Sequence, residues 1–221
     1  MKTILAVVGD YYHPEQAIKA ALEKAAAAVS GREEIRLRYT TADRLAEGLA
    51  GKPDAAVLFK ENRVNPQDEQ VKMWMTEAAE AAIVSYVREG GGWLAWHSGL
   101  ASYREDGAYV AMLRGYFKHH PDKHQIVRYE AVSAGGGPLG LAGAASAFGI
   151  LDEHYFVYCD EANTNVFLRS ASVDGESIAG WSHAFGRGRV LCLTPAHNPE
   201  GLLHPGMIDT LGASIVWCAG G

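Results

Sequence analysis

The sequence predicts an α/β protein with three layers, in which a mostly parallel β-sheet lies between helices on both of its faces and has a short antiparallel extension. Three observations support this fold class. In the first half, apolar runs of strand length alternate with amphipathic stretches of helical length. Strands separated in this way need crossover connections, which join parallel neighbours. In the second half, short strands follow one another closely, as they do in antiparallel sheets.

The first half begins with the apolar run TILAVV at residues 3–8, which predicts a buried strand. Pro14 precedes an Ala-rich stretch and marks the start of a helix over residues 14–30, because proline fits the first turn of a helix. The later elements follow from the same periodicities. They are a strand at 34–39, a short helix at 41–50, a strand at 54–59, a long helix at 67–89 and a strand at 92–96.

The second half has shorter elements and more glycine. Residues 133–149 are rich in Gly and Ala and predict a loop. Asp174 and Gly175 stand between two apolar runs and predict a hairpin turn. No linker or internal repeat divides the chain, so residues 1–221 are expected to form a single domain. The remaining elements are a helix at 109–117, strands at 124–132, 155–159, 166–170, 177–183 and 189–193, and a closing helix at 205–219.

The composition argues against several classes of protein. A formal net charge of −6 at pH 7, without a basic cluster, gives no sign of a basic surface that would bind a nucleic acid. No apolar run reaches the roughly 20 residues that span a membrane. The expected partner is therefore a small molecule. Cys159, Cys192 and Cys218 have apolar neighbours and no CxxC spacing, which predicts buried free thiols and a place in the reducing cytoplasm.

Three histidines follow predicted strands at the point where each strand ends. His13 lies in the loop after the first strand, His97 directly follows the fourth, and His197 follows the strand at 189–193. If these strands are parallel neighbours, the three imidazoles meet at the carboxyl edge of the sheet, where α/β proteins bind their ligands. The alternative for each is a hydrogen-bonded histidine with a structural role.

A carboxylate to accompany the histidines comes from the stretch ILDEHYF, in which Asp152 and Glu153 interrupt an apolar run. A carboxyl group beside apolar walls has a raised pKa and can hold or deliver a proton, as general acid–base catalysis requires. Glu153 is the preferred member of the pair. The alternative is that the two acids cap a helix or form ion pairs.

Several segments together resemble one known family. The motifs AWHSGL, YFKHHP and DEHY, and the tail FGRGRVLCLTPAHNPEGLLHPGMIDTLGASIVWCAG, are similar to the ThuA-like (trehalose utilisation) family over nearly the whole chain. The resemblance implies the flavodoxin-like fold of class I glutamine amidotransferases. The family's recurring polar positions map to His97, His120, Glu153 and His197, and Tyr155 is the aromatic residue of the DEHY motif.

The chain departs from these relatives at positions that bear on its activity. In amidotransferases of this fold, the elbow that corresponds to His97, Ser98 and Gly99 carries a nucleophilic cysteine, which this elbow lacks. Without a thiolate, thioester chemistry on glutamine cannot proceed, so an amidotransferase is rejected. Ser98 as a substitute nucleophile lacks the surrounding G-x-S-x-G of hydrolase elbows. Ala196 stands where the family often has Gly, and residues 133–149 do not match a His-Pro segment that is frequent there.

The resemblance to proteins of sugar catabolism implies a substrate derived from a carbohydrate, such as a 3-keto sugar. A keto sugar has an acidic C–H beside its carbonyl, so a base and an acid could drive isomerisation, or elimination and hydrolysis of the glycosidic bond. Glu153 or His97 is the expected base, and His197 the expected acid or carbonyl polariser. The residues expected to contact the substrate are His13, Trp96, His120 and Tyr155.

Three further expectations stay open at this point. A divalent metal such as zinc could be held by His13, His97, Glu153 and His197, although no short metal-binding motif is present. The chain could instead be a non-catalytic sugar-binding or regulatory module on an amidotransferase-like scaffold. A contact between two copies of the chain could be marked by Met73, Trp74 and Met75 on the long helix, with core packing as the alternative.

Overall fold

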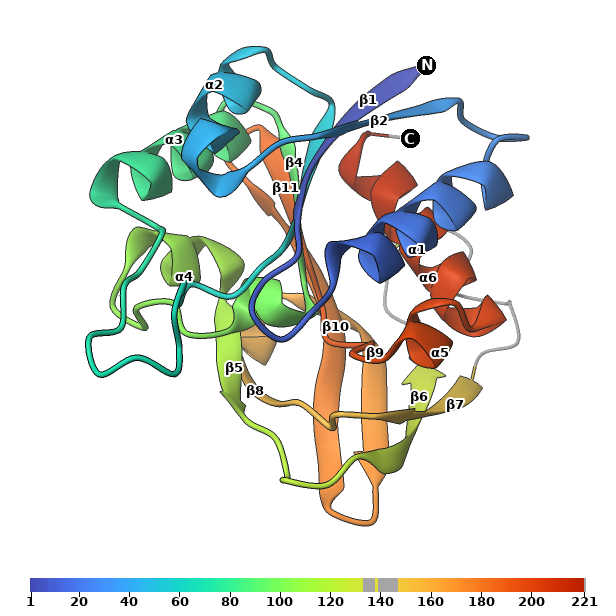
Figure 1. The fold of residues 1–221 in the computed structure, drawn as a ribbon. Coiled ribbons are helices and arrows are strands. Elements are labelled where there is room, and N and C mark those ends of the chain that lie inside the picture. Colours follow the sequence, from blue (N-terminus) through green and yellow to red (C-terminus); the bar gives the residue numbers. More distant parts are fainter. Residues whose placement is uncertain (133–137, 139–146, 221) are drawn as a thin grey trace.

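A nine-stranded mixed sheet forms the centre of the computed structural model, which describes residues 1–132, 138 and 147–220 (Figure 1). One half of the sheet is parallel and contains, in spatial order, β2 (Ile35–Tyr39), β1 (Lys2–Val8), β3 (Ala55–Phe59), β4 (Gly92–Trp96) and β11 (Gly188–Leu193). The other half is antiparallel and continues with β10 (Gly175–Phe185), β9 (Asn165–Ser172), β6 (Gln125–Ala131) and β7 (Ala147–Asp152). The α/β fold class is therefore confirmed.

Helices cover both faces of the parallel half and complete the three layers. One face carries α1 (Glu15–Ala28), α5 (Pro199–Leu202) and α6 (Pro205–Cys218), and the other carries α2 (Leu45–Ala50), α3 (Glu77–Arg88) and α4 (Ala108–Leu113). Short 3₁₀ turns are η1 (Ala42–Arg44), η2 (His97–Leu100) and η3 (Glu161–Asn163). A separate two-stranded sheet pairs β5 (Gly115–His119) with β8 (Phe156–Cys159). None of the helices in the described part of the chain is both long and apolar enough to cross a bilayer.

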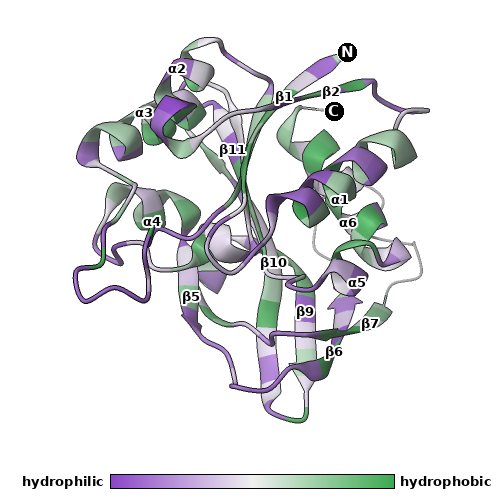
Figure 2. Ribbon diagram, viewed as in Figure 1, coloured by the Kyte–Doolittle hydropathy of each residue, from purple (hydrophilic) through white to green (hydrophobic). Residues whose placement is uncertain are grey.

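Two hydrophobic cores lie on opposite faces of the sheet, because side chains alternate along each strand. In β1, Ile4 faces the core beneath α1 and α6, whereas Leu5 faces the core beneath α2 and α3. In β4, Trp96 belongs to the first core and Trp93 to the second. Every residue of β4 is buried, as a parallel strand covered on both faces requires. Figure 2 shows hydrophobic residues on the central strands and a largely hydrophilic loop between β3 and α3.

The predicted helix at 67–89 begins ten residues later than expected, since α3 spans Glu77–Arg88. The side chain of Thr76 accepts a hydrogen bond from the backbone of Ala79 and caps the helix there. Before the cap, an isolated bridge between Arg63 and Met73 holds the chain in a loop. Met73, Trp74 and Met75 therefore precede the helix, and the last two pack against the core beneath α2 and α3.

The predicted helix at 109–117 is half helix and half strand. Helix α4 ends at Leu113, because Arg114 adopts a left-handed backbone conformation with φ of 57°, and β5 follows at once. The hairpin turn predicted at Asp174–Gly175 is confirmed, since it joins β9 to β10. The loop prediction for 133–149 is wrong at residues 147–149, which begin β7, and most of the rest lies outside the described residues.

Candidate active site

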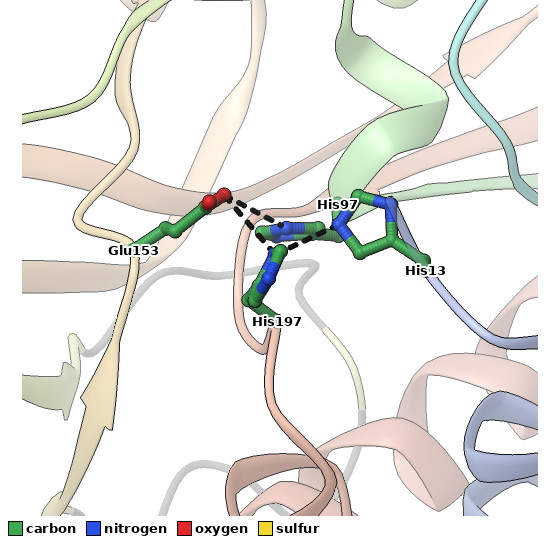
Figure 3. A group of neighbouring side chains, drawn as sticks. All are labelled: His13, His97, Glu153 and His197. Carbon is green, nitrogen blue, oxygen red and sulfur yellow. Dashed lines mark hydrogen bonds and ion pairs between the residues drawn. The ribbon is translucent and has the colours of Figure 1, made fainter. Parts of the chain in front are cut away.

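Four strands that run in the same direction bring polar side chains to one edge of the sheet. β1, β4 and β11 are parallel, and the alternating directions of β10, β9, β6 and β7 make β7 run the same way. His13 follows β1, His97 follows β4, His197 follows β11 and Glu153 follows β7. Figure 3 shows these side chains turned toward one another, and one ligand atom of each lies within 4.8 Å of the others. We call these four residues the histidine cluster.

His97 stands on a sharp elbow and is fully buried. Its φ is 47°, and a Cβ at Gly99 would meet the backbone oxygen of Leu58 at 2.2 Å, so the turn needs glycine there. Nδ1 lies 2.7 Å from the carbonyl oxygen of Thr194, which can only accept, so Nδ1 carries the proton. The lone pair is then on Nε2, which is buried and has no hydrogen-bond partner in the described structure. Its ring stacks on Tyr155 at 4.1 Å.

His13 is oriented by Asp10, a residue that the sequence analysis did not identify. Nδ1 of His13 lies 2.6 Å from Oδ1 of Asp10, and Nε2 lies 2.8 Å from Nδ1 of His197. Oδ2 of Asp10 accepts hydrogen bonds from Ser98 and from the backbone of Glu61. Burial raises the pKa of Asp10, but the interactions with His13 and Ser98 outweigh burial and lower it overall. Asp10 is therefore anionic and holds the Nδ1 proton of His13, which points Nε2 into the cluster.

Asp152 and Glu153 have different roles in the site. Asp152 is buried, and its Oδ1 accepts backbone hydrogen bonds from Glu153 at 3.0 Å and from His197 at 2.7 Å. Tyr129 donates to Oδ2 at 2.9 Å. Burial raises the pKa of Asp152 to about 7. Asp152 thus fixes the two backbone segments that carry Glu153 and His197, while the Glu153 side chain enters the cluster.

The carboxylate of Glu153 lies between buried and exposed imidazoles. Oε2 is 3.2 Å from Nδ1 of His197 and 3.6 Å from Nε2 of His97. Oε1 is 3.8 Å from Nε2 of both His120 and His124. Burial raises the pKa of Glu153, but His197 and His97 outweigh burial and lower it, so the raised pKa expected for this carboxyl is wrong.

The two imidazoles nearest Glu153 respond to it in opposite ways. Burial lowers the pKa of His97 to about 4, so this ring is neutral. Burial also acts to lower the pKa of His197, but the hydrogen bond and charge of Glu153 outweigh it and raise the pKa. The site therefore combines an anionic carboxylate, a neutral imidazole and an imidazole that readily takes a proton.

The structure brings together five of the seven predicted site residues at the cluster or its rim: His13, His97, His120, Glu153 and His197. Trp96 is the clearest correction. It is fully buried in the core beneath α1 and α6, and its indole donates to the carbonyl of Pro195, because alternation along β4 turns it away from the edge. Tyr155 is also buried, between His97 and Phe117, so its ring supports His97 and is not open to a sugar.

The residues that sequence reasoning missed are Asp10, His124 and the role of Ser98. Asp10 stands three residues before His13 in the same loop, a spacing that could have suggested the pair. Ser98 is 1% exposed and donates its hydroxyl to Asp10 at 2.7 Å, so it holds a carboxylate and is not a free nucleophile. His124 belongs to the motif HHPDKH, of which only His120 was singled out.

The cluster has the chemistry of a metal site. Three imidazole nitrogens and one carboxylate oxygen suit zinc or a related divalent ion. Two of the imidazoles are fixed by a partner on the far nitrogen, His13 by Asp10 and His97 by the carbonyl of Thr194, as is usual for metal-bound histidines. The unpartnered Nε2 of His97 is a buried lone pair that an ion would satisfy. The residues therefore fit a divalent cation.

A cavity of about 560 Å³ lies at the opposite edge of the sheet. Its walls include Asp54 before β3, Gly91 before β4 and Gly220 after α6. It is therefore separate from the histidine cluster, which stands at the carboxyl ends of the same strands.

The fold and site define a class of α/β proteins in which a histidine and a serine occupy the elbow after a central strand, with no thiol there. The comparisons with known proteins give the family. A family model described as ThuA, trehalose utilisation, matches residues 5–218, and the chain belongs to this family. No curated protein matches the chain.

Solved structures show the same fold. A ThuA-like protein from Parabacteroides merdae is 12% identical with a TM-score of 0.70, and the match covers 99% of this chain and 90% of that one. A cytoplasmic protein from Salmonella typhimurium is 15% identical with a TM-score of 0.67, and the match covers 99% of both chains. Agd3, a carbohydrate deacetylase, is 11% identical with a TM-score of 0.65, and the match covers 100% of this chain but 33% of that one.

Proposed function

We propose that the chain is an enzyme that acts on a sugar or keto-sugar derivative by acid–base chemistry with the help of a divalent metal ion, as a hydrolase or isomerase. The observation that carries the proposal is the buried, unpartnered Nε2 of His97, which faces the Glu153 carboxylate inside the histidine cluster. A scaffold that had lost its function would not need a buried lone pair beside a half-buried carboxylate, since the arrangement is costly when nothing bridges it.

His13, His97, His197 and Oε2 of Glu153 would hold the ion. The ion would supply a Lewis acid for a carbonyl oxygen and a lowered pKa for water. Oε1 of Glu153 faces the exposed side of the cluster, toward His120 and His124. This oxygen can take the proton of a C–H bond beside a carbonyl, or the proton of an attacking water.

The same atoms also support a route without a metal. Glu153 then acts as the base, and His197 acts as the acid, because Glu153 raises its pKa. Nδ1 of His197 lies 3.2 Å from Oε2 of Glu153, so the two groups are close enough to exchange a proton. Metal content therefore decides between the two routes.

The family description, trehalose utilisation, supports a carbohydrate derivative as the small-molecule substrate. The match to a carbohydrate deacetylase, over 33% of that chain, also supports this substrate class. We also place the chain in the cytoplasm, in line with the similar cytoplasmic protein of Salmonella and with Cys159, Cys192 and Cys218, which are all free.

The test combines metal content with turnover. The chain is purified without added metal or a polyhistidine tag, and zinc is measured by elemental analysis in the wild type, His97→Ala and Glu153→Gln. His119→Ala is the control, since His119 is exposed and stacks on Phe156. We expect one ion per wild-type chain, less in His97→Ala, and a loss of about 100-fold or more in turnover of 3-keto-trehalose by Glu153→Gln. Full activity in both variants would overturn the proposal.

A further inference from the structure

Two histidines stand on the solvent side of Glu153, on the segment between β5 and β6. Nε2 of His120 and Nε2 of His124 each lie 3.8 Å from Oε1 of Glu153. Their side chains are 35% and 34% exposed, whereas that of Glu153 is 13% exposed. The two imidazoles are therefore the solvent-exposed neighbours of Oε1. We call His120 and His124 the entrance pair.

The neighbours of the entrance pair fix opposite roles for the two Nε2 atoms. Nδ1 of His120 lies 2.9 Å from the carbonyl oxygen of Pro121, so Nδ1 donates and Nε2 of the neutral ring accepts. Nδ1 of His124 lies 3.0 Å from Nδ2 of Asn198, which donates, so the proton of the neutral ring is on Nε2. One member of the pair is an acceptor and the other is a donor.

Neither Nε2 is satisfied by Glu153, because 3.8 Å is too long for a hydrogen bond. A hydroxyl group matches what the pair offers, since it accepts from His124 and donates to His120 at the same time. An ionised carboxylate offers acceptors alone and would meet both the lone pair of the neutral His120 ring and the anionic Glu153, whose Oε1 lies 3.8 Å from that lone pair's nitrogen. The pair therefore favours a neutral polyol over an anionic ligand.

Ring contacts hold the entrance pair in place. The ring of His120 lies parallel to that of Tyr155, with 6.0 Å between centroids, and 5.8 Å from that of Phe117. The ring of His124 stands edge-on to His197 at 5.2 Å. The two Nε2 atoms are thus positioned before a ligand arrives, which reduces the entropy lost on binding.

We propose that the entrance pair binds one hydroxyl group of a neutral sugar, next to the carbon on which Glu153 acts. This inference rests on the proposed function for the role of Glu153, but the binding of the hydroxyl itself does not require turnover. His120 and His124 are then residues that determine specificity for an uncharged carbohydrate.

The experiment measures the binding of trehalose and of 3-keto-trehalose by calorimetry, and KM and kcat for the keto sugar, in four variants. His120→Phe and His124→Phe remove the polar atoms at similar size, His124→Gln keeps a donor, and His119→Phe, at the end of β5, is the control. We expect the first two to weaken binding and raise KM by about 10-fold or more, since each removes one of the two hydrogen-bond partners of the bound hydroxyl. They should raise KM more than they lower kcat, and zinc content should not change.

The remaining outcomes separate the two proposals. His124→Gln should recover part of the affinity, and His119→Phe should match the wild type. Wild-type Kd and KM in both phenylalanine variants would overturn the proposal that the entrance pair binds a hydroxyl group, and would leave the proposed function standing. Sugar binding that depends on the pair, without turnover by the wild type, would overturn the proposed function and retain the pair. Absence of binding of either sugar to the wild type would overturn both.

Discussion

Replacement of Asp10 by Asn tests how the histidine cluster is kept ready for a cation. The Asp10 carboxylate accepts side-chain hydrogen bonds from His13 at 2.6 Å and Ser98 at 2.7 Å, and a backbone hydrogen bond from Glu61 at 3.0 Å. An amide has one acceptor oxygen and one NH₂ group. If the NH₂ faces Glu61, it opposes the backbone N–H of Glu61, which is also a donor. If it faces His13, it opposes the backbone N–H groups of Tyr12 and His13, which donate to Oδ1, and the ring must change tautomer so that Nε2 carries a proton in place of a lone pair.

The size of the effect follows from these contacts. A hydrogen bond to a charged group contributes about 1.5–3 kcal/mol, and an unpaired buried donor costs about 1–3 kcal/mol. We expect Asp10→Asn to lower the free energy of unfolding by about 2–4 kcal/mol. Loss of the partner of a metal-bound histidine weakens metal binding about 10- to 100-fold, which is about 1.4–2.7 kcal/mol.

The assay has two readouts, urea unfolding without metal and calorimetric titration with zinc. Ser98→Ala is the matched variant, because it removes one donor to Asp10 and leaves the carboxylate in place. We expect this variant to lose about 1.5 kcal/mol of stability and to keep most of its zinc affinity. Wild-type zinc affinity in Asp10→Asn, even with lower stability, would refute the idea that the Asp10 carboxylate prepares His13 to bind the ion.

Three further predictions concern the scaffold. Gly99→Ala should lower the free energy of unfolding by about 2 kcal/mol or more in urea unfolding, because its Cβ would lie 2.2 Å from the backbone oxygen of Leu58; unchanged stability would contradict the close approach. Burial lowers the pKa of His183 from 6.5 to about 4, so the unfolded chain takes up a proton first as the pH falls. The wild type should therefore lose about 3 kcal/mol more than His183→Gln between these two pH values, and parallel pH profiles of stability would refute this. Burial also raises the pKa of the Cys192 and Cys218 thiols, so neither should react with a thiol reagent until the chain is unfolded. Rapid labelling of either of these two residues in the native protein would contradict this prediction.

The sequence predicted most of the strands and helices because their signals are local. The run TILAVV and the run around Trp93 are continuous because both faces of a central parallel strand are covered. The errors fall where local signals compete with contacts to the rest of the chain. Residues 67–76 have helical composition, but the cap at Thr76 and the bridge at Met73 keep them in a loop.

The candidate site could be predicted as far as strand order could be inferred. Parallel neighbours end at the same edge, so His13, His97 and His197 were expected to meet, and they lie in one cluster. Glu153 was expected from its apolar surroundings, although nothing local shows that β7 runs in the same direction as β11. The prediction that Trp96 contacts the substrate is wrong, because side chains alternate along a strand and that of Trp96 points into the core beneath α1 and α6.

The sequence by itself determined which residues end the strands, and with them the imidazoles and the carboxylate that this protein can use, because periodicity and strand ends are properties of short segments. Only the tertiary structure decided what those groups can do. The tautomer of His97, the low pKa of Glu153 and the pairing of Asp10 with Ser98 depend on partners far apart in the chain. Hydrogen bonds and burial act through space, so no local pattern encodes them.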